Sequence, residues 1–418
     1  MSGLTLVSSN DMSNWGQSQA DQRYRYGVQS DAYTLLDLIE NRFAYAERFP
    51  NWIVPVRSEL QAQIPYLQGR NDLVRFCQNA FHALFDHHSI TEIGLLDDYA
   101  LVPSFADLWV EKTPSGYQIM DVRRGSPALQ AGIRPGTMIT SLEGKPIEQA
   151  VADFIGYYPY ALDDERRAYA ARVMAAGRKG WIRRIGLFCD GLHWTVELPT
   201  LYHWRLKRDT NLISVRSVSH LGRRFGIMRF NDSLGYNETV QAFDYALNTL
   251  SGVDGLVLDL RDTAGGGTAL VARGILSRFV SAPTVYQRHE LPSDERDFGV
   301  RRTWNEEVTP RGWTFNRPVS VISGRWTASM GEGLTVGFDA IGAGTFGTDM
   351  ARLLGGISDH KLPETDITVK LTTEKLFHVD GTPREQFRPR GYFNYADAPG
   401  EDGQDGPMNA ALDYLSQH

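Results

Sequence analysis

Ser329 has the surroundings that an acyl-transfer nucleophile needs. It follows an apolar, β-rich run at residues 319–322 and a turn of small residues, and a helical pattern begins beside it. A helix N-terminus favours developing negative charge, and the amide of Met330 can donate a hydrogen bond to an oxyanion. We therefore expect Ser329 to act as a nucleophile and Met330 to help form an oxyanion hole.

A second strand-like run, at residues 255–260, leads into a glycine-rich turn. Glycine leaves its backbone amide unshielded, so we expect Gly265 or Gly266 to supply the other donor of the oxyanion hole. Taken alone, each of the two segments fits a strand end and a flexible turn equally well. The glycines are not followed by the G-K-[ST] sequence of a nucleotide-binding loop, which disfavours ATP use.

Together and in this order, the two segments resemble those of the tail-specific, or C-terminal processing, protease family, which includes the core of the tricorn protease. The D-x-R-x-N-x-G-G segment of that family appears here at residues 259–266, with Thr263 in place of asparagine, and its T-x-S-x-x-E turn appears at residues 327–332. The resemblance implies a serine peptidase with a crotonase/ClpP-like α/β core. The G-x-S-x-G elbow of α/β-hydrolases is absent, because Thr327 stands where its first glycine should be.

A serine hydroxyl needs a base, and two kinds occur in this family. In the lysine type the base ends a T-F-G-K sequence after the nucleophile, whereas this chain has Thr348 at that position. Tricorn-like members instead carry a histidine within a D-x-H sequence at the end of a helical region. The resemblance therefore points to His88 in Asp86-His87-His88, a pair that without Ser329 would be interpreted as solvated helix caps.

A histidine base works best when a third group fixes its tautomer. Tricorn-like relatives place a glutamate near the end of the catalytic region, and Glu385 is the corresponding candidate here. The alternative is a surface glutamate paired with Arg384 or Arg388. Glu332, one helical turn beyond Ser329, either tunes the site or caps the helix.

The elements that must position these residues fall into four predicted segments. Residues 1–30 are polar and expected to be irregular, and residues 31–104 form a helical domain that carries the candidate base. Residues 105–200 form the next segment, in which residues 153–176 are expected to be a solvated helical connection. Residues 201–418 alternate strand and helix and form the catalytic core, so the predicted fold class is α/β, or α+β multidomain.

Proline and glycine residues are expected to interrupt the N-terminal helices. Pro50 and Pro55 are expected to break the first helical run, and Pro65 and Gly69 to split the second.

The segment at residues 105–200 resembles a bacterial PDZ module. A strand pattern at residues 116–122 is followed by G-S-P-A, A-G-I and P-G sequences, with Thr137 in place of the usual aspartate. PDZ modules bind chain ends by strand addition at a sheet edge. The expected binding loop at residues 105–108 lacks the usual glycines, so a structural or gating role is equally compatible with the sequence.

Composition limits the remaining classes of function. The 418 residues carry a net charge of −7 and 42% hydrophobic side chains, which indicates a soluble globular protein without a nucleic-acid footprint. Cys77 lies in a helical pattern and is expected to be a buried free thiol, and no metal or other cofactor is predicted.

No apolar run approaches the ~20 residues of a membrane span, and no secretory signal is apparent. The protein is cytoplasmic, or else periplasmic or secreted after removal of a leader.

The sequence therefore predicts a peptidase that acts on peptides or proteins through an acyl-enzyme on Ser329. A binding scaffold with a degraded catalytic set is the main alternative, because Thr137, Thr263 and Thr348 all depart from the family pattern. Hydrolysis of non-peptide esters or amides by the same serine is a third. Cleavage preference and homo-oligomerisation are left open.

Overall fold

The computed structural model describes residues 9–52, 57–202, 211–400 and 403–418, so Pro55 lies outside it. Three sheets and the helices around them give a mixed α/β fold. Cys77 is buried and free, as predicted.

The sheet that carries Ser329 has six strands in the order β17-β14-β13-β10-β9-β8. These are β8 (Ile213–His220), β9 (Arg223–Phe230), β10 (Gly255–Asp259), β13 (Val319–Ser323), β14 (Gly344–Gly347) and β17 (Gly391–Tyr392). All neighbouring strands are parallel except β8 and β9. Every residue of β10 is buried, because helices cover both faces of the sheet. The carboxyl ends of β10 and β13 consequently lie side by side, and both candidate segments leave the sheet there.

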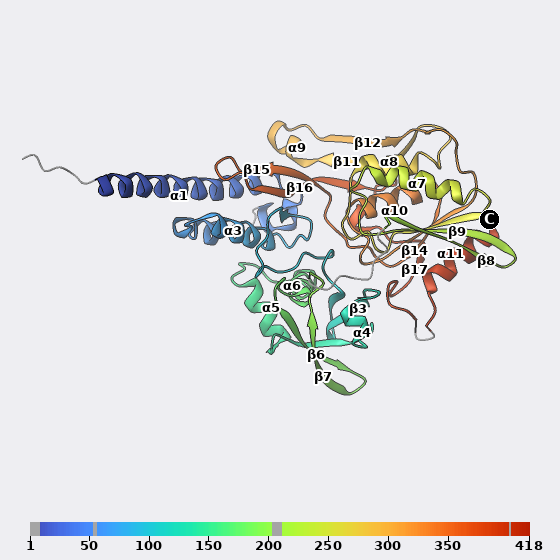
Figure 1. Cartoon of the computed structure of the whole chain (residues 1–418), viewed down its shortest axis with the longest axis horizontal. Coiled ribbons are helices and arrows are strands. Elements are labelled where there is room, and N and C mark those ends of the chain that lie inside the picture. The colour runs from blue at the N-terminus through green and yellow to red at the C-terminus, as the bar shows by residue number, and fades with distance from the viewer. Residues whose placement is uncertain (1–8, 53–56, 203–210, 401–402) are drawn as a thin grey trace, which may run out of the picture.

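Helices of this unit pack on both faces of the sheet (Figure 1). They are α7 (Glu238–Thr249), α8 (Ala269–Leu276), α10 (Met330–Ala340) and α11 (Gly406–Gln417). Leu247, Ile275 and Phe338 from the first three helices form one core with Leu256 and Leu258 of β10. On the opposite face, α11 packs on Val257 and Ile322. The predicted alternation of strands and helices is confirmed here.

A second, antiparallel sheet joins this unit to the N-terminal helices. Its strands are β1 (Ile90–Thr91), β11 (Thr284–Leu291), β12 (Arg302–Val308), β15 (Gly356–Lys361) and β16 (Thr368–Phe377), and α9 (Pro292–Phe298) connects β11 to β12. Leu371 of β16 packs against Leu35 of α1 (Ser9–Arg42) and Leu73 of α3 (Arg70–His82). Shorter helical turns are η1 (Ala46–Arg48), η2 (Pro50–Trp52), α2 (Arg57–Gln61) and η3 (Ile64–Tyr66). The split near Pro65 and Gly69 is as predicted.

The prediction that residues 1–30 are irregular is wrong for the described part, because α1 is helical from Ser9 onward and projects from the molecule (Figure 1). Val28, Ala32 and Leu35 bury the end of this helix that contacts the rest of the fold. From Val28 back toward Ser9, the helix extends away from that contact. It can stay helical there because each residue added to an existing helix contributes one more backbone hydrogen bond. Residues 21–26 are exposed, so the polar composition of this part reflects exposure on a helix and not an irregular chain.

The third sheet consists of strands from the PDZ-like segment, in the order β2-β3-β4-β6-β7, with β5 paired to β4. The strands are β2 (Leu108–Thr113), β3 (Gly116–Val122), β4 (Met138–Leu142), β5 (Lys145–Pro146), β6 (Ile182–Cys189) and β7 (Leu192–Pro199). The helices are α4 (Pro127–Gln130), α5 (Ile147–Ile155) and α6 (Asp164–Ala176). Ser126 caps α4 by accepting a hydrogen bond from the Leu129 amide at 3.2 Å. The PDZ assignment itself stays a prediction.

Helix α6 is not the solvated connection that its charges predicted. Tyr169, Arg172 and Val173 are buried, and alanines on the same helix allow it to approach β2 closely. Arg172 Nη1 donates to the Val110 carbonyl of β2 at 3.3 Å. The charged residues that suggested exposure lie in the first turn, whereas the rest of the helix is part of the core.

Candidate active site

Ser329 lies in a strained turn between β13 and α10. Its backbone has φ 51° and ψ −112°, a region that residues with a side chain rarely adopt. Thr327 Oγ1 secures this turn, because it accepts from the Gly324 amide and donates to the Leu260 carbonyl, both at 2.9 Å. Glu332 Oε2 accepts from the Ser329 amide at 2.8 Å. The strain at Ser329 is therefore held by contacts to both strand ends.

The imidazole of His88 faces Ser329. Its Nε2 lies 3.0 Å from Ser329 Oγ, across 241 positions of sequence, and its Nδ1 lies 2.7 Å from the Leu354 carbonyl oxygen. A carbonyl only accepts, so Nδ1 carries the proton and Nε2 is left to accept from the hydroxyl. This is the geometry by which a neutral histidine removes a proton from serine.

Asp86 fixes the loop that carries His88. Its Oδ1 accepts from the His88 amide at 2.9 Å, while Oδ2 accepts from the hydroxyls of Ser89 at 2.7 Å and Thr372 at 2.6 Å. Thr372 belongs to β16, so the loop is tied to the second sheet. The D-x-H spacing was the only sequence signal for this role, and it was used to locate the histidine rather than to assign the aspartate.

The charge state of His88 follows from its surroundings. Burial and the nearby Arg384 guanidinium lower its pKa to about 4, against an opposing effect of the Asp86 carboxylate. The imidazole is therefore neutral at pH 7, which is the form that a general base needs.

His87, the neighbour of the candidate base, is held apart from Ser329. Its ring stacks on Tyr169 of α6 with centroids 4.3 Å apart, and Arg172 Nε donates to its Nε2 at 3.2 Å. Burial and the Arg172 charge lower the pKa of His87. This histidine thus packs the catalytic loop against α6.

Glu332 caps α10, because its carboxylate accepts from the Ser329 amide, but it is completely buried and therefore not a solvated cap. Burial raises its pKa to about 7, although Arg384 and the hydrogen bond from Ser329 act in the opposite direction. Arg384 Nη2 lies 3.8 Å from Glu332 Oε2 and donates to the carbonyls of Leu353 and Gly355 at 3.2 and 2.6 Å. Glu332 thus holds the backbone at Ser329, and Arg384 holds the backbone on either side of Leu354, the residue whose carbonyl contacts His88.

Glu385 does not occupy the predicted place beside His88. His88 Nδ1 donates its hydrogen bond to the Leu354 carbonyl instead, and no hydrogen bond from Glu385 to His88 is found among the described residues. Glu385 lies in η4 (Arg384–Gln386) near Tyr45, where burial raises the pKa of its carboxyl. The partner of the imidazole is a backbone atom, which no sequence motif marks. The alternative, a surface pair with Arg384 or Arg388, is not found among the described residues either, because Arg384 is buried and Arg388 pairs with Asp349 at 3.1 Å.

The predicted oxyanion donors divide into two groups. Met330 is the first residue of α10, before the first helical hydrogen bond from Gly333 to Ser329, so its amide has no helical acceptor. By contrast, the amide of Gly265 donates to Asp232 at 2.9 Å and that of Gly266 to Thr263 at 3.1 Å. In this structure, therefore, the glycine amides hold their own turn and are not free donors.

Gly266 nevertheless borders the nucleophile. A Cβ atom at this position would lie 2.8 Å from Ser329 Cβ and 3.2 Å from Ser329 Oγ, and its φ is +66°. Close approach and a left-handed backbone both require glycine here. Thr263, the departure from the family pattern, is accommodated by a hydrogen bond from its hydroxyl to the Leu260 carbonyl at 2.9 Å.

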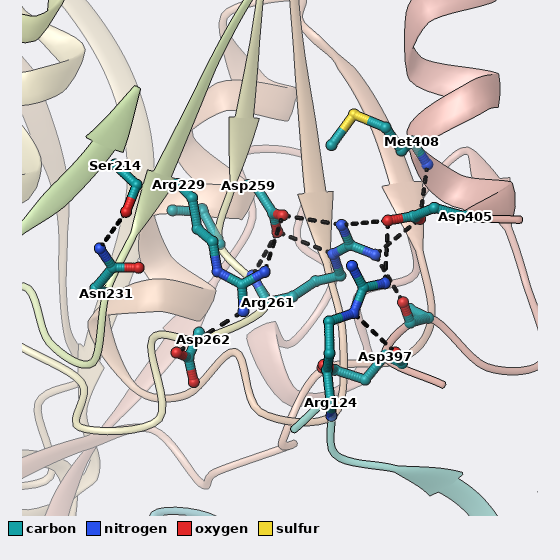
Figure 2. Close-up of polar contacts among 12 residues, drawn as sticks. Arg124, Ser214, Arg229, Asn231, Asp259, Arg261, Asp262, Asp397, Asp405 and Met408 are labelled. Carbon is teal, nitrogen blue, oxygen red and sulfur yellow. Dashed lines mark hydrogen bonds and ion pairs between the residues drawn. The ribbon is translucent and has the colours of Figure 1, made fainter. Parts of the chain in front are cut away.

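The D-x-R pair of the first motif builds an ion network (Figure 2). Arg261 donates to Asp259 and to Asp405 at 2.9 Å. Asp405 also accepts from the Met408 amide at 3.2 Å at the start of α11, and from Arg124 Nη2 at 3.1 Å. Arg124 follows β3, so this network joins the end of β10 to α11 and to the third sheet.

Thr348 supplies no base. It is buried, and its hydroxyl donates to the Asp349 carbonyl at 2.8 Å.

Within the described ranges, no group of three or more His, Cys, Asp or Glu residues is arranged to hold a metal ion. No helix of the described chain is long and apolar enough to cross a membrane.

Comparisons with known proteins concern the fold and the region around Ser329. Residues 224–388, which include Ser329 but not His88, match the model of peptidase family S41. Mature CPAF has a similar fold, with a TM-score of 0.58 at 14% identity over 94% of this chain and 96% of that chain. The photosystem II D1 C-terminal processing protease matches with a TM-score of 0.55 at 15% identity over 90% of this chain and 96% of that chain. No curated protein matches the sequence.

Proposed function

We propose that this chain, a serine-type peptidase whose S41 region spans residues 224–388, cleaves peptide bonds through an acyl-enzyme on Ser329 with His88 as general base. The observation that carries the proposal is the 3.0 Å contact between His88 Nε2 and Ser329 Oγ. The 2.7 Å contact from His88 Nδ1 to the Leu354 carbonyl supports it, because this contact selects the tautomer that can accept the proton.

The reaction follows from these contacts. As Ser329 Oγ attacks the peptide carbonyl carbon, its proton passes to His88 Nε2, and the carbonyl oxygen becomes an oxyanion that accepts from the Met330 amide. The imidazolium then gives the proton to the departing amine. A water molecule, deprotonated by the same nitrogen, hydrolyses the ester. Loss of a single oxyanion donor typically lowers turnover by about 100-fold or more, so the Met330 amide is essential to this scheme.

The histidine-base branch and the PDZ-like module are parts of the same proposal. The base assignment is supported by Thr348, which replaces the lysine of the other branch. We divide the chain into a helical region at residues 31–104, a PDZ-like region at residues 105–200 and a catalytic core at residues 201–418. The separate sheet of β2 to β7 supports the PDZ-like region, whereas the second sheet pairs β1 of the helical region with β16 of the core. Peptides and unfolded protein segments are the proposed substrates.

A non-catalytic peptide-binding scaffold is favoured by one observation. The amides of Gly265 and Gly266 are both engaged, so of the three predicted oxyanion donors, all within the described residues, only Met330 is left without a backbone acceptor. Catalysis then requires a small rearrangement of the glycine turn when substrate binds.

An unbiased peptide-library digest followed by mass spectrometry separates the two functions. The native protein should cut a defined set of bonds, while the Ser329→Ala protein, used as the blank, should cut none of them. Identical cleavage by both proteins, or no cleavage by either at high enzyme concentration, would remove the peptidase proposal.

A further inference from the structure

A cavity of about 920 Å³ lies between the N-terminal helices and the third sheet. Its walls come from α2, α3, α5 and the segment that joins α6 to β6, and neither Ser329 nor His88 lines it. The volume falls within the range of sites that bury ligands or peptide side chains. The cavity is thus separate from the candidate active site, and its lining includes Met174 of α6 but no residue of β2.

Apolar side chains at the mouth of this cavity are unusually exposed. Tyr157, Trp181 and Ile182 line it and have 62%, 60% and 58% of their surface exposed. Deeper in the cavity, Tyr99 and Phe154 pack edge to face with centroids 5.3 Å apart. Clustered exposed apolar groups mark interaction sites, and aromatic residues supply most of the affinity in such sites.

The charged residues that line the cavity indicate the charge of a complementary ligand. Five acidic residues line the cavity against three basic ones: Glu59, Asp97, Asp98, Glu143 and Asp153 against Arg75, Lys145 and Arg178. Arg75 pairs with Asp97 at 2.7 Å and Lys145 pairs with Asp153 at 2.6 Å, so each pair cancels one base and one acid. Three acids, Glu59, Asp98 and Glu143, are then left against Arg178. Burial lowers the pKa of His82, at the cavity wall, to about 4, so this group adds no positive charge. A complementary ligand is basic as well as apolar.

The cavity shares its wall with the catalytic loop. Phe85 lines it and lies three positions before His88. His82, also in the wall, contacts the Tyr169 hydroxyl through Nδ1 at 2.9 Å, and Tyr169 stacks on His87. The cavity wall is therefore packed, through Tyr169, against the loop that carries His87 and His88.

We propose that the cavity is an exosite that binds a basic, apolar segment of the polypeptide substrate away from the scissile bond. An aromatic or aliphatic side chain of that segment packs against Trp181 and Phe154, and a neighbouring lysine or arginine pairs with Glu59 or Glu143. The identification of the ligand as substrate rests on the proposed peptidase function. Its chemical preference does not, because the lining alone determines it.

Binding is measured with the Ser329→Ala protein, so the result is independent of catalysis. Two fluorescein-labelled peptides of equal length are compared by anisotropy, one alternating arginine with leucine and phenylalanine, the other carrying glutamate at the arginine positions. We expect the basic peptide to bind at least tenfold more tightly than the acidic one, and added Trp181→Ala to weaken its binding at least tenfold.

Tyr245→Ala is the matched control, since Tyr245 lies on α7, outside the cavity, and is 75% exposed. It should leave affinity for the basic peptide unchanged. Equal affinity for both peptides, or equal effects of Trp181→Ala and Tyr245→Ala, would overturn the exosite. Loss of cleavage in the digest described above, with peptide binding intact, would instead count against the peptidase function alone.

Discussion

Glu332→Gln tests whether the acid beneath Ser329 is held in an environment that favours its protonated form. The folded-state pKa of about 7 lies above the reference value of 4.5 because of burial. The folded protein therefore holds this proton more tightly than the unfolded chain does. Its stabilising effect is complete below pH 4.5 and is lost as pH rises toward 7.

The size of the effect follows from that shift. A change from 4.5 to about 7 corresponds to a loss of about 3 kcal/mol in the free energy of unfolding between pH 4.5 and pH 8. Glutamine resembles the protonated acid and can still accept from the Ser329 amide. We expect Glu332→Gln to match the native protein at pH 4.5 and to exceed its stability at pH 8 by about this amount.

The assay is urea unfolding followed by tryptophan fluorescence at pH 4.5, 6 and 8. The difference between variant and native protein isolates Glu332 from the other titrating groups. Glu307→Gln, at an exposed position of β12, is the control and should show no pH-dependent difference. A Glu332→Gln difference that stays constant across this pH range would refute the reasoning.

Three further predictions concern the same site. The acidic limb of kcat/KM should lie well below pH 6.5, because burial and a nearby guanidinium lower the pKa of His88 to about 4, and activity is lost as pH falls through that value; a limb at or above 6.5 would contradict this. Gly266→Ala should lower kcat by about 100-fold with the protein still folded by circular dichroism, because its Cβ would displace Ser329, which lies 2.8 Å from it; unchanged kcat would show that the contact does not matter. Arg261→Met should lower the free energy of unfolding by about 3 kcal/mol, since buried Asp259 then keeps only Arg229, 3.7 Å away, and urea unfolding measures this loss; a change below 1 kcal/mol would argue against the network.

Sequence patterns located the residues whose role depends on side-chain type. Ser329 was found because a strand, a small-residue turn and a helix start follow one another. His88 was proposed from the resemblance of Asp86-His87-His88 to a D-x-H sequence, with Thr348 in place of the lysine as support, and the structure brings its ring to Ser329. These features are local in sequence even though the two residues meet across the fold.

Features that depend on the backbone could not be predicted in this way. The Leu354 carbonyl that orients His88 has no side-chain signature and lies 266 positions away. The engagement of the Gly265 amide depends on the Asp232 carbonyl, which only the folded chain brings near. The burial of α6 was likewise not predicted. The charged residues in its first turn suggested an exposed helix, whereas the alanines further along allow the helix to pack in the core.

The central claim is that His88 activates Ser329, and active-site labelling followed by peptide mapping tests it most directly. A fluorophosphonate probe should form one adduct, on Ser329, in the native protein. We expect no adduct in Ser329→Ala and labelling at least 100-fold slower in His88→Ala. Labelling of His88→Ala at the native rate, or an adduct on a different serine, would contradict the account.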